Sequence, residues 1–304
     1  MFISLSSGTL TDILVRFQTI ERESGFFSDD EANPLRDYWH VIVPYCSSDT
    51  WAGTGYSQGS GYSYHGKHIF RNVMNSLSHH YNLFEATDFV LSGSSAGGFG
   101  VGLNCDDVAE WLHGENNNPG VNVKCVADAP DFIPWWVHSE GCPRREEDYQ
   151  EFVNSYWSRD MDHSCQDFAF DPASNVSDPW ELCGMLSKSL PFVESDLFVM
   201  VSLRDTAISR DYGCPEPGLE EEVFAPWRAG VRGLIGAVNA NNPRVGWFAP
   251  SCEVHTISGL TQNMTVPDVH SGERMSSYAA LARWMGGQVV HAADGLEVDN
   301  PTCP

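Results

Sequence analysis

The stretch FVLSGSSAGG, at residues 89–98, decides the fold of this 304-residue chain. An apolar run leads directly into the pattern G-x-S-x-G, centred on Ser95, and a segment of helical character follows. A serine on such a sharp strand-to-helix turn exposes its hydroxyl at the end of the strand. We therefore expect Ser95 to be a nucleophile and the N–H of Ala96 to face a developing oxyanion. The alternative is an ordinary turn, which glycine and serine also build.

Strand-like and helix-like segments alternate on both sides of this turn. Ile69, Val73 and Leu77, for example, recur at the i, i+4 spacing of a helix that packs on a sheet. Such alternation indicates an α/β-hydrolase-like fold, with a mainly parallel sheet and helices on both faces. We expect strands at 41–45, 89–91, 123–127, 197–203 and 246–250, and helices at 66–80, 96–112, 219–239 and 276–285.

Residues 130–191 interrupt the alternation. The segment holds four tryptophans and three cysteines and shows no long period. We interpret it as a lid or insertion within a single esterase-like domain that spans residues 1–304. Phe132, Trp135 and Trp136 are candidates for the wall of an aromatic pocket, with simple packing as the alternative.

A serine hydroxyl is a poor nucleophile at neutral pH, so Ser95 needs a base, and the base needs an acid to orient it. In this fold the chain order is serine, acid, histidine. Asp205 lies two residues beyond the expected strand 197–203, at the sheet edge where functional groups gather. Asp211 is the alternative acid.

The base is expected to be His255, which follows the expected strand 246–250. His270 and His291 are its competitors. A single aspartate or histidine is more often a surface or core residue than a catalyst. The positions at strand ends, in the right chain order, favour Asp205 and His255.

The charge of the chain restricts its partners. Forty-one acidic and 17 basic side chains give a formal net charge of −24. Such a surface repels phosphate backbones and anionic lipid head groups, which disfavours nucleic acid and membrane surfaces. No apolar stretch reaches the 18 or more residues of a membrane span, so we expect no stable membrane anchoring.

The nine cysteines favour disulfides over a metal site. They are scattered without a CxxC pair, and the sequence has no HExxH motif, so we expect neither a metal nor another cofactor. Sequons at Asn175 and Asn263 agree with a secreted protein. The N-terminus has no signal-peptide pattern, and we expect the signal peptide to be absent from this sequence. A cytosolic protein with free thiols is the alternative.

Two motifs are specific when taken together. The motif VPYCSSD at residues 43–49, with Trp51 after it, precedes the serine motif at residues 93–98. Farther along, FAPSC at residues 248–252 leads into His255. In this order the motifs resemble the Notum branch of the pectin acetylesterase family, and the similarity spans nearly the whole chain.

This resemblance implies that Ser95, Asp205 and His255 form a catalytic triad that hydrolyses a carboxylic ester without a metal or cofactor. Notum proteins remove a palmitoleoyl group from Wnt proteins, and plant members of the family remove acetyl groups from pectin. We therefore expect an acylated protein or polysaccharide as the substrate, with a pectin or polysaccharide acetylesterase as the alternative. The motifs do not determine the acyl length.

The sequence departs from the family pattern at its start. Family members carry, upstream of VPYCSSD, a strand that ends in a Gly-Gly-Trp loop with further oxyanion donors, and this sequence contains no such motif. We expect that strand and loop to be missing, which leaves Ala96 as the identifiable donor and Cys46 without a partner. A catalytically impaired relative that binds acyl groups is a further alternative.

Overall fold

The computed structural model describes most of the 304 residues. The residues outside the description are 7–24, 57–60, 115–117, 131–161, 178–181, 185, 208–219, 260–263 and 296–298.

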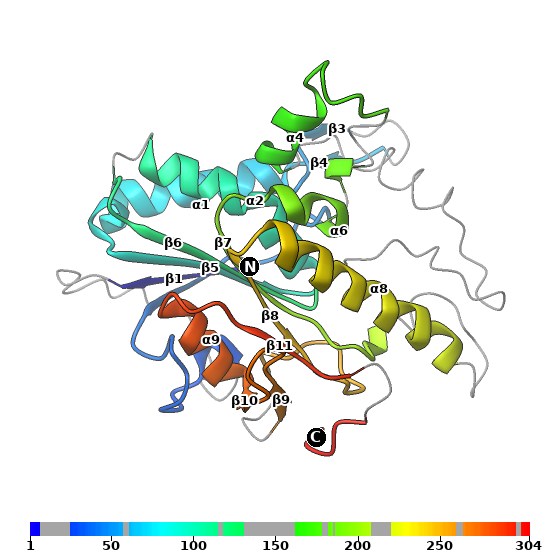
Figure 1. Cartoon of the computed structure of the whole chain (residues 1–304). Coiled ribbons are helices and arrows are strands. Elements are labelled where there is room, and N and C mark those ends of the chain that lie inside the picture. Colours follow the sequence, from blue (N-terminus) through cyan, green and yellow to red (C-terminus); the bar gives the residue numbers. More distant parts are fainter. Residues whose placement is uncertain are drawn as a thin grey trace.

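A seven-stranded sheet runs through the centre of the described part of the chain, in the order β11-β8-β7-β6-β5-β1-β2 (Figure 1). The strands from β5 to β11 pair in parallel, whereas β1 pairs antiparallel with both β5 and β2. This mainly parallel sheet confirms the predicted fold class. The strands are β1 Phe2–Ser6, β2 Trp39–Ile42, β5 Asp88–Ser94, β6 Asn122–Asp128, β7 Asp196–Met200, β8 Val245–Ala249 and β11 His291–Ala293.

Helices cover both faces of the sheet (Figure 1). Three of them, α1 Gly66–Tyr81, α2 Ala96–His113 and α8 Glu220–Asn241, lie over one face, and α9 Ser277–Met285 lies under the other. The expectation of helices on both faces is therefore confirmed.

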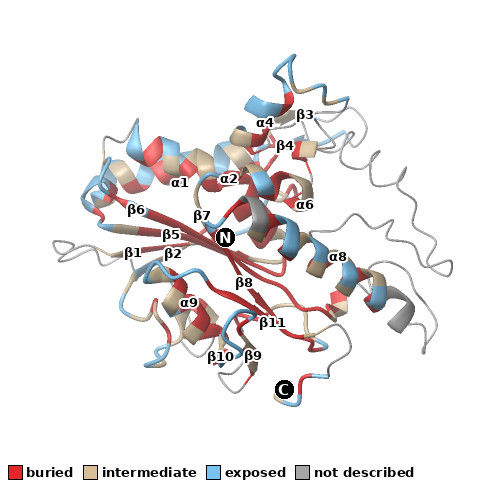
Figure 2. Ribbon diagram, viewed as in Figure 1, coloured by how far each residue is buried: buried red, intermediate tan, exposed pale blue. Residues whose placement is uncertain are grey.

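Successive side chains of each strand point to opposite faces of the sheet, so a hydrophobic core forms on each face. In β5, Phe89 and Leu91 point into the core shared with α1, α2 and α8, while Val90 points into the core shared with α9. Figure 2 shows the central strands as buried over most of their length. Strands that are buried on both faces read as continuous apolar runs, which is why the sequence around residue 90 was recognisable as a strand.

The described residues also include shorter elements. They are β3 Gly55–Tyr56, β4 Ser63–Tyr64, β9 Thr265–Pro267, β10 Arg274–Ser276, α4 His163–Ala169, α6 Leu186–Ser189, and the 3₁₀ helices η1 Gly25–Phe27, η2 Leu83–Glu85 and η3 Leu190–Phe192. Both α4 and α6 belong to the predicted insertion 130–191, whose role as a lid stays a prediction. Phe132, Trp135 and Trp136 lie outside the described residues.

Every strand and helix expected from the sequence overlaps an observed one. The strand expected at 41–45 is shifted, because β2 ends at Ile42, before Pro44, which cannot donate to a strand ladder. Two strands of the sheet were missed, β1 and β11.

A strand does lie upstream of VPYCSSD, because β1 is placed between β5 and β2. The expected absence of the family strand that ends in a Gly-Gly-Trp loop stays a prediction. Leu5 of β1 pairs with Phe89 of β5 on one side and with Trp39 of β2 on the other. Residues 7–24, which follow β1, lie outside the described residues.

Disulfides connect these elements, as the cysteine pattern predicted. Cys105–Cys125 joins α2 to β6, Cys165–Cys183 lies within the insertion, and Cys252–Cys303 joins the loop after β8 to the last residues of the sequence. Cys46 is exposed and unpaired, as expected.

Helix α2 approaches the ends of β5 and β6 very closely, and Gly98 makes this possible. A Cβ atom on Gly98 would lie 2.6 Å from the backbone oxygen of Asp128, a contact that requires the backbone to move. By contrast, a Cβ atom on the neighbouring Gly97 would meet nothing nearer than 3.4 Å, which is ordinary van der Waals contact.

We predict that Gly98→Ala lowers the free energy of unfolding by about 1–3 kcal/mol, the usual cost of overpacking a core. Gly97→Ala is the matched control and should change it by less than about 1 kcal/mol, because alanine also favours the helix. Denaturant unfolding of both variants with their disulfides intact tests the prediction. Equal stabilities would contradict the close packing of α2.

Candidate active site

Ser95 lies at the turn between β5 and α2, with a backbone conformation of φ 56° and ψ −123°. A positive φ is uncommon for a residue other than glycine, and such residues gather at functional sites. The N–H of Ser95 donates to the backbone oxygen of Asp128 at 2.8 Å, and its carbonyl accepts from the N–H of Phe99 at 3.0 Å. The turn is therefore held by the next strand and by the first turn of the helix.

His255 contacts both Ser95 and Asp205. Its Nε2 lies 2.8 Å from the Ser95 hydroxyl, and its Nδ1 lies 2.8 and 2.9 Å from the two Asp205 oxygens. The loop after β7 carries Asp205, and the loop after β8 carries His255. The three residues selected from the sequence are thus brought together at the carboxyl ends of parallel strands.

Asp205 is buried and held in place, so its carboxylate can orient the His255 imidazole. Its side chain is 2% exposed, whereas that of His255 is 29% exposed. One Asp205 oxygen also accepts the N–H of Ala207 at 2.8 Å, which fixes the carboxylate. Because a carboxylate accepts hydrogen bonds, Nδ1 of a neutral His255 carries the proton, and Nε2 is left to accept from Ser95.

Ala96 is the first residue of α2, so its N–H is among those that receive no partner within the helix. The helix dipole adds a partial positive charge at this end. This position suits a donor to a negatively charged oxygen beside Ser95.

A buried serine joins the loop after β7 to the loop after β8. The Ser202 hydroxyl bonds the carbonyl oxygen of Cys252 and accepts the N–H of Arg204 at 3.1 Å. The backbone oxygen of Ser202 accepts a hydrogen bond from the Trp227 indole of α8 at 2.9 Å. The segment that leads into Asp205 is therefore bound to the segment that leads into His255.

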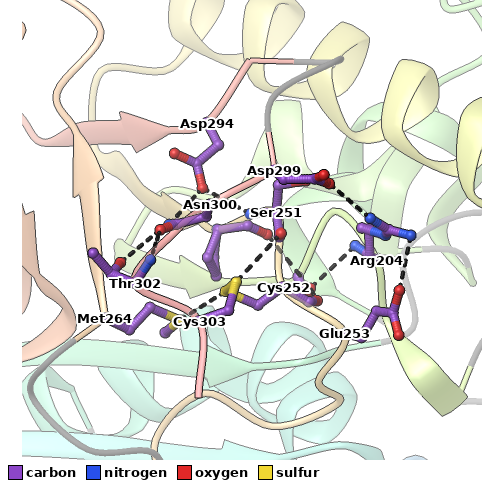
Figure 3. The surroundings of a disulfide bond; sticks show 12 residues. Arg204, Ser251, Cys252, Glu253, Met264, Asp294, Asp299, Asn300, Thr302 and Cys303 are labelled. Carbon is purple, nitrogen blue, oxygen red and sulfur yellow. Dashed lines mark hydrogen bonds and ion pairs between the residues drawn. A yellow bond between two sulfur atoms is a disulfide. The ribbon is translucent and has the colours of Figure 1, made fainter.

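Figure 3 shows how the start of the histidine loop is held. The disulfide Cys252–Cys303 lies three residues before His255. Beside it, the Asp294 carboxylate accepts the N–H of Ser251 and the amide of Asn300, each at 2.8 Å.

A second set of contacts in Figure 3 surrounds Arg204, the neighbour of Asp205. The Arg204 guanidinium forms ion pairs with Glu253 at 2.8 Å and with Asp299 at 3.0 Å. These pairs are partly exposed, so each contributes little energy, but together they tie both loops to the residues before Cys303.

The alternative site residues are not brought to Ser95 in the described structure. His270 and His291 bond each other at 3.1 Å, and Nε2 of His291 also lies 3.3 Å from the oxygen of Val245. Burial lowers the pKa of His291, which keeps it neutral as a packed residue of β11. Asp211 lies outside the described residues.

A cavity of about 400 Å³ lies between α1 and the C-terminal half of α2, away from the serine turn. Charged groups such as Arg71 and Asp107 line it together with Met74 and Trp111. None of Ser95, Asp205 and His255 lines this cavity. Over the described residues, no group of three or more His, Cys, Asp or Glu side chains is arranged to hold a metal ion.

The family model for pectinacetylesterase matches residues 16–304. The chain belongs to the pectinacetylesterase family. The match covers the serine turn, both loops and the insertion, in agreement with the resemblance seen in the motifs.

Relatives include palmitoleoyl-protein carboxylesterases. The mouse enzyme NOTUM is 30% identical over an alignment of 309 positions that covers 91% of this chain and 57% of the relative. The Xenopus laevis enzyme notum1 is 30% identical over 255 residues, 77% of this chain and 48% of the relative. The chain therefore spans about half the length of these relatives.

A solved structure, that of the Wnt deacylase Notum from Drosophila, has the same fold. It aligns with a TM-score of 0.71 and 23% identity, over 92% of this chain and 78% of that one. None of the helices in the described part of this chain is long and apolar enough to cross a bilayer.

We predict that replacing both Cys252 and Cys303 by serine loosens the histidine loop. Opening a disulfide that closes a separation of 51 residues should lower the free energy of unfolding by about 2–4 kcal/mol. Amide hydrogen exchange at residues 251–258 should become faster. The matched control, Cys165 and Cys183 both replaced by serine, should also lose stability but leave exchange in that loop unchanged. Unchanged exchange in the first variant would contradict the role of the disulfide.

Proposed function

We propose that this chain is a serine carboxylesterase that hydrolyses an O-acyl ester on a protein or polysaccharide. The observation that carries the proposal is the continuous line of hydrogen bonds from Asp205 through His255 to Ser95. It occurs at a strained strand-to-helix turn in a member of an esterase family.

In the proposed reaction the Ser95 hydroxyl attacks the acyl carbonyl carbon while His255 takes its proton at Nε2. The C–O bond to the alcohol then breaks, and His255 returns the proton to the leaving oxygen. Asp205 remains ionised and stabilises the positive charge that forms on the imidazole. Water next attacks the acyl-enzyme by the same route in reverse, which releases the carboxylic acid and free Ser95.

The N–H of Ala96 is the proposed donor to the oxyanion. Removal of one such donor typically costs about 10²–10³ in rate, so its contribution is about 3–4 kcal/mol. The position at the first turn of α2 adds a fixed dipole that needs no rearrangement during the reaction.

The relatives suggest the class of substrate. Several bear the description palmitoleoyl-protein carboxylesterase, and the Drosophila structure is described as a Wnt deacylase. We therefore propose an acylated protein as the first substrate to test and an acetylated polysaccharide as the second. The disulfides fit a secreted protein, because such bonds persist in oxidising compartments.

We predict that Ser95→Ala abolishes ester hydrolysis, with a fall of at least about 10⁴-fold in kcat. The cause would be loss of the nucleophile, so the unfolding midpoint should stay close to that of the wild type. Release of p-nitrophenol from acetate and octanoate esters measures the rate, and the ratio between the two esters reports acyl preference.

Two further variants serve as controls. His255→Ala should match Ser95→Ala, whereas His270→Ala should retain activity, because His270 bonds His291 instead of the serine. Turnover that survives Ser95→Ala would refute the proposed nucleophile. A folded wild type that binds acyl chains without cleaving either ester would instead favour an impaired acyl-binding relative.

A further inference from the structure

Asp128 is a buried carboxylate that the reaction scheme does not use. It is the last residue of β6, it is 0% exposed, and it pairs in register with Ser94, the residue before the nucleophile. Its backbone and its side chain contact different parts of the site.

The backbone of Asp128 supports the serine turn. Its carbonyl oxygen accepts the N–H of Ser95 at 2.8 Å and is also the atom closest to a Cβ on Gly98. The position of the nucleophile is therefore set directly against this residue.

The side chain of Asp128 holds the other end of the histidine loop. One oxygen accepts the N–H of Ile257 at 2.8 Å, and the other accepts the N–H of Ser258 at 3.0 Å. The second oxygen also accepts the Ser258 hydroxyl at 2.5 Å and the Ser94 hydroxyl at 3.0 Å. Ile257 and Ser258 follow His255 by two and three residues.

We infer that Asp128 is a positioning residue that fixes the distance between the Ser95 hydroxyl and the His255 imidazole. One residue holds the nucleophile through its carbonyl and the base through its carboxylate, and both bonds lie inside the protein. This inference rests on the proposed esterase function for its effect on rate, but the positioning itself is a property of the fold.

The bonding pattern requires a carboxyl group at this position. Burial raises the pKa of Asp128, and the hydrogen bonds from Ser258, Ile257 and Ser94 oppose that rise. In either protonation state both oxygens can accept a backbone N–H, one from Ile257 and one from Ser258. An asparagine has the same shape, but its NH₂ group cannot accept, so one of these two N–H groups would face a donor.

Asp128→Asn is therefore the test variant, and Asp268→Asn is the matched control. Asp268 is also largely buried, and its carboxylate accepts two backbone N–H groups, those of His270 and Ser271, and the Ser271 hydroxyl. It belongs to the turn between β9 and β10, which carries neither Ser95 nor His255. All three bonds of Asp268 go to one oxygen, Oδ1, which an asparagine keeps, whereas Asp128 uses both oxygens. Asp268→Asn therefore controls for the same change of charge and side chain at a buried turn, and only Asp128→Asn should move the base.

The test combines steady-state kinetics on a p-nitrophenyl ester with proton NMR of the His255–Asp205 hydrogen bond. A displacement of about 1 Å in an active site can cost about 10²-fold. We expect Asp128→Asn to lower kcat about 10–100-fold with KM within about threefold of the wild-type value. In this variant the downfield signal of the His255 Nδ1 proton should shift or broaden. Asp268→Asn should keep both kcat and the signal.

The outcomes separate this inference from the proposed function. If the wild type cleaves the ester and Asp128→Asn retains kcat and the signal, Asp128 has no positioning role. If the folded wild type cleaves no ester, the proposed function fails, and the NMR signal alone decides whether Asp128 positions His255. A change confined to Asp128→Asn then supports positioning, and an unchanged signal overturns it. Equal changes in both variants would mean general loosening and would also overturn it.

Discussion

The close approach of α2 to the ends of β5 and β6 is the constraint on which the rest of the site depends. It leaves room for backbone only, so glycine occupies position 98 and Ser95 adopts a left-handed φ of 56°. A residue in this conformation persists only where its surroundings determine it. Here the Ser95 N–H bonds the backbone of β6, and the buried strands on either side have no freedom to yield. The backbone of Ser95 therefore has a fixed position before any partner of its hydroxyl is considered.

His255 lies on a loop. A loop must be held at both ends if its imidazole is to be positioned as accurately as Ser95. Before it, the Ser202 bond, the disulfide Cys252–Cys303 and the Asp294 carboxylate hold the chain. After it, Asp128 takes two successive backbone N–H groups. Only residues 253–256 lie between these restraints, so in the proposed function little conformational entropy remains to be lost when the ester binds. The His255 side chain itself stays 29% exposed.

How much of this was predictable depends on how local each signal is. The serine turn was recognisable because its strand, small residues and helix are adjacent in the sequence. Asp205 and His255 followed from chain order and from their positions at strand ends, and the fold brings them to Ser95 as expected. The strands β1 and β11 were missed because one is a short segment at the very start of the chain and the other spans three residues. Nothing local marks Asp128 as a partner of residues 257 and 258, because about 130 residues separate them and only the folded sheet, in which β7 lies between β6 and β8, brings the end of β6 to the loop after β8.

The same geometry also explains why the class of bond in the proposed reaction, a carboxylic ester, is easier to infer than the acyl group or its carrier. All the proposed machinery sits at the ends of neighbouring strands and acts on atoms common to every carboxylic ester. In the proposed esterase, acyl length would depend on the walls of an acyl pocket, which the turn and loops do not specify. In the proposed function, the net charge of −24 would bear on the carrier of the ester, because it slows the approach of an anionic polymer more than that of a protein with a basic surface. At physiological salt this effect fades beyond about 8 Å, so it would modulate encounter and leave the proposed chemical step to Ser95 and its partners.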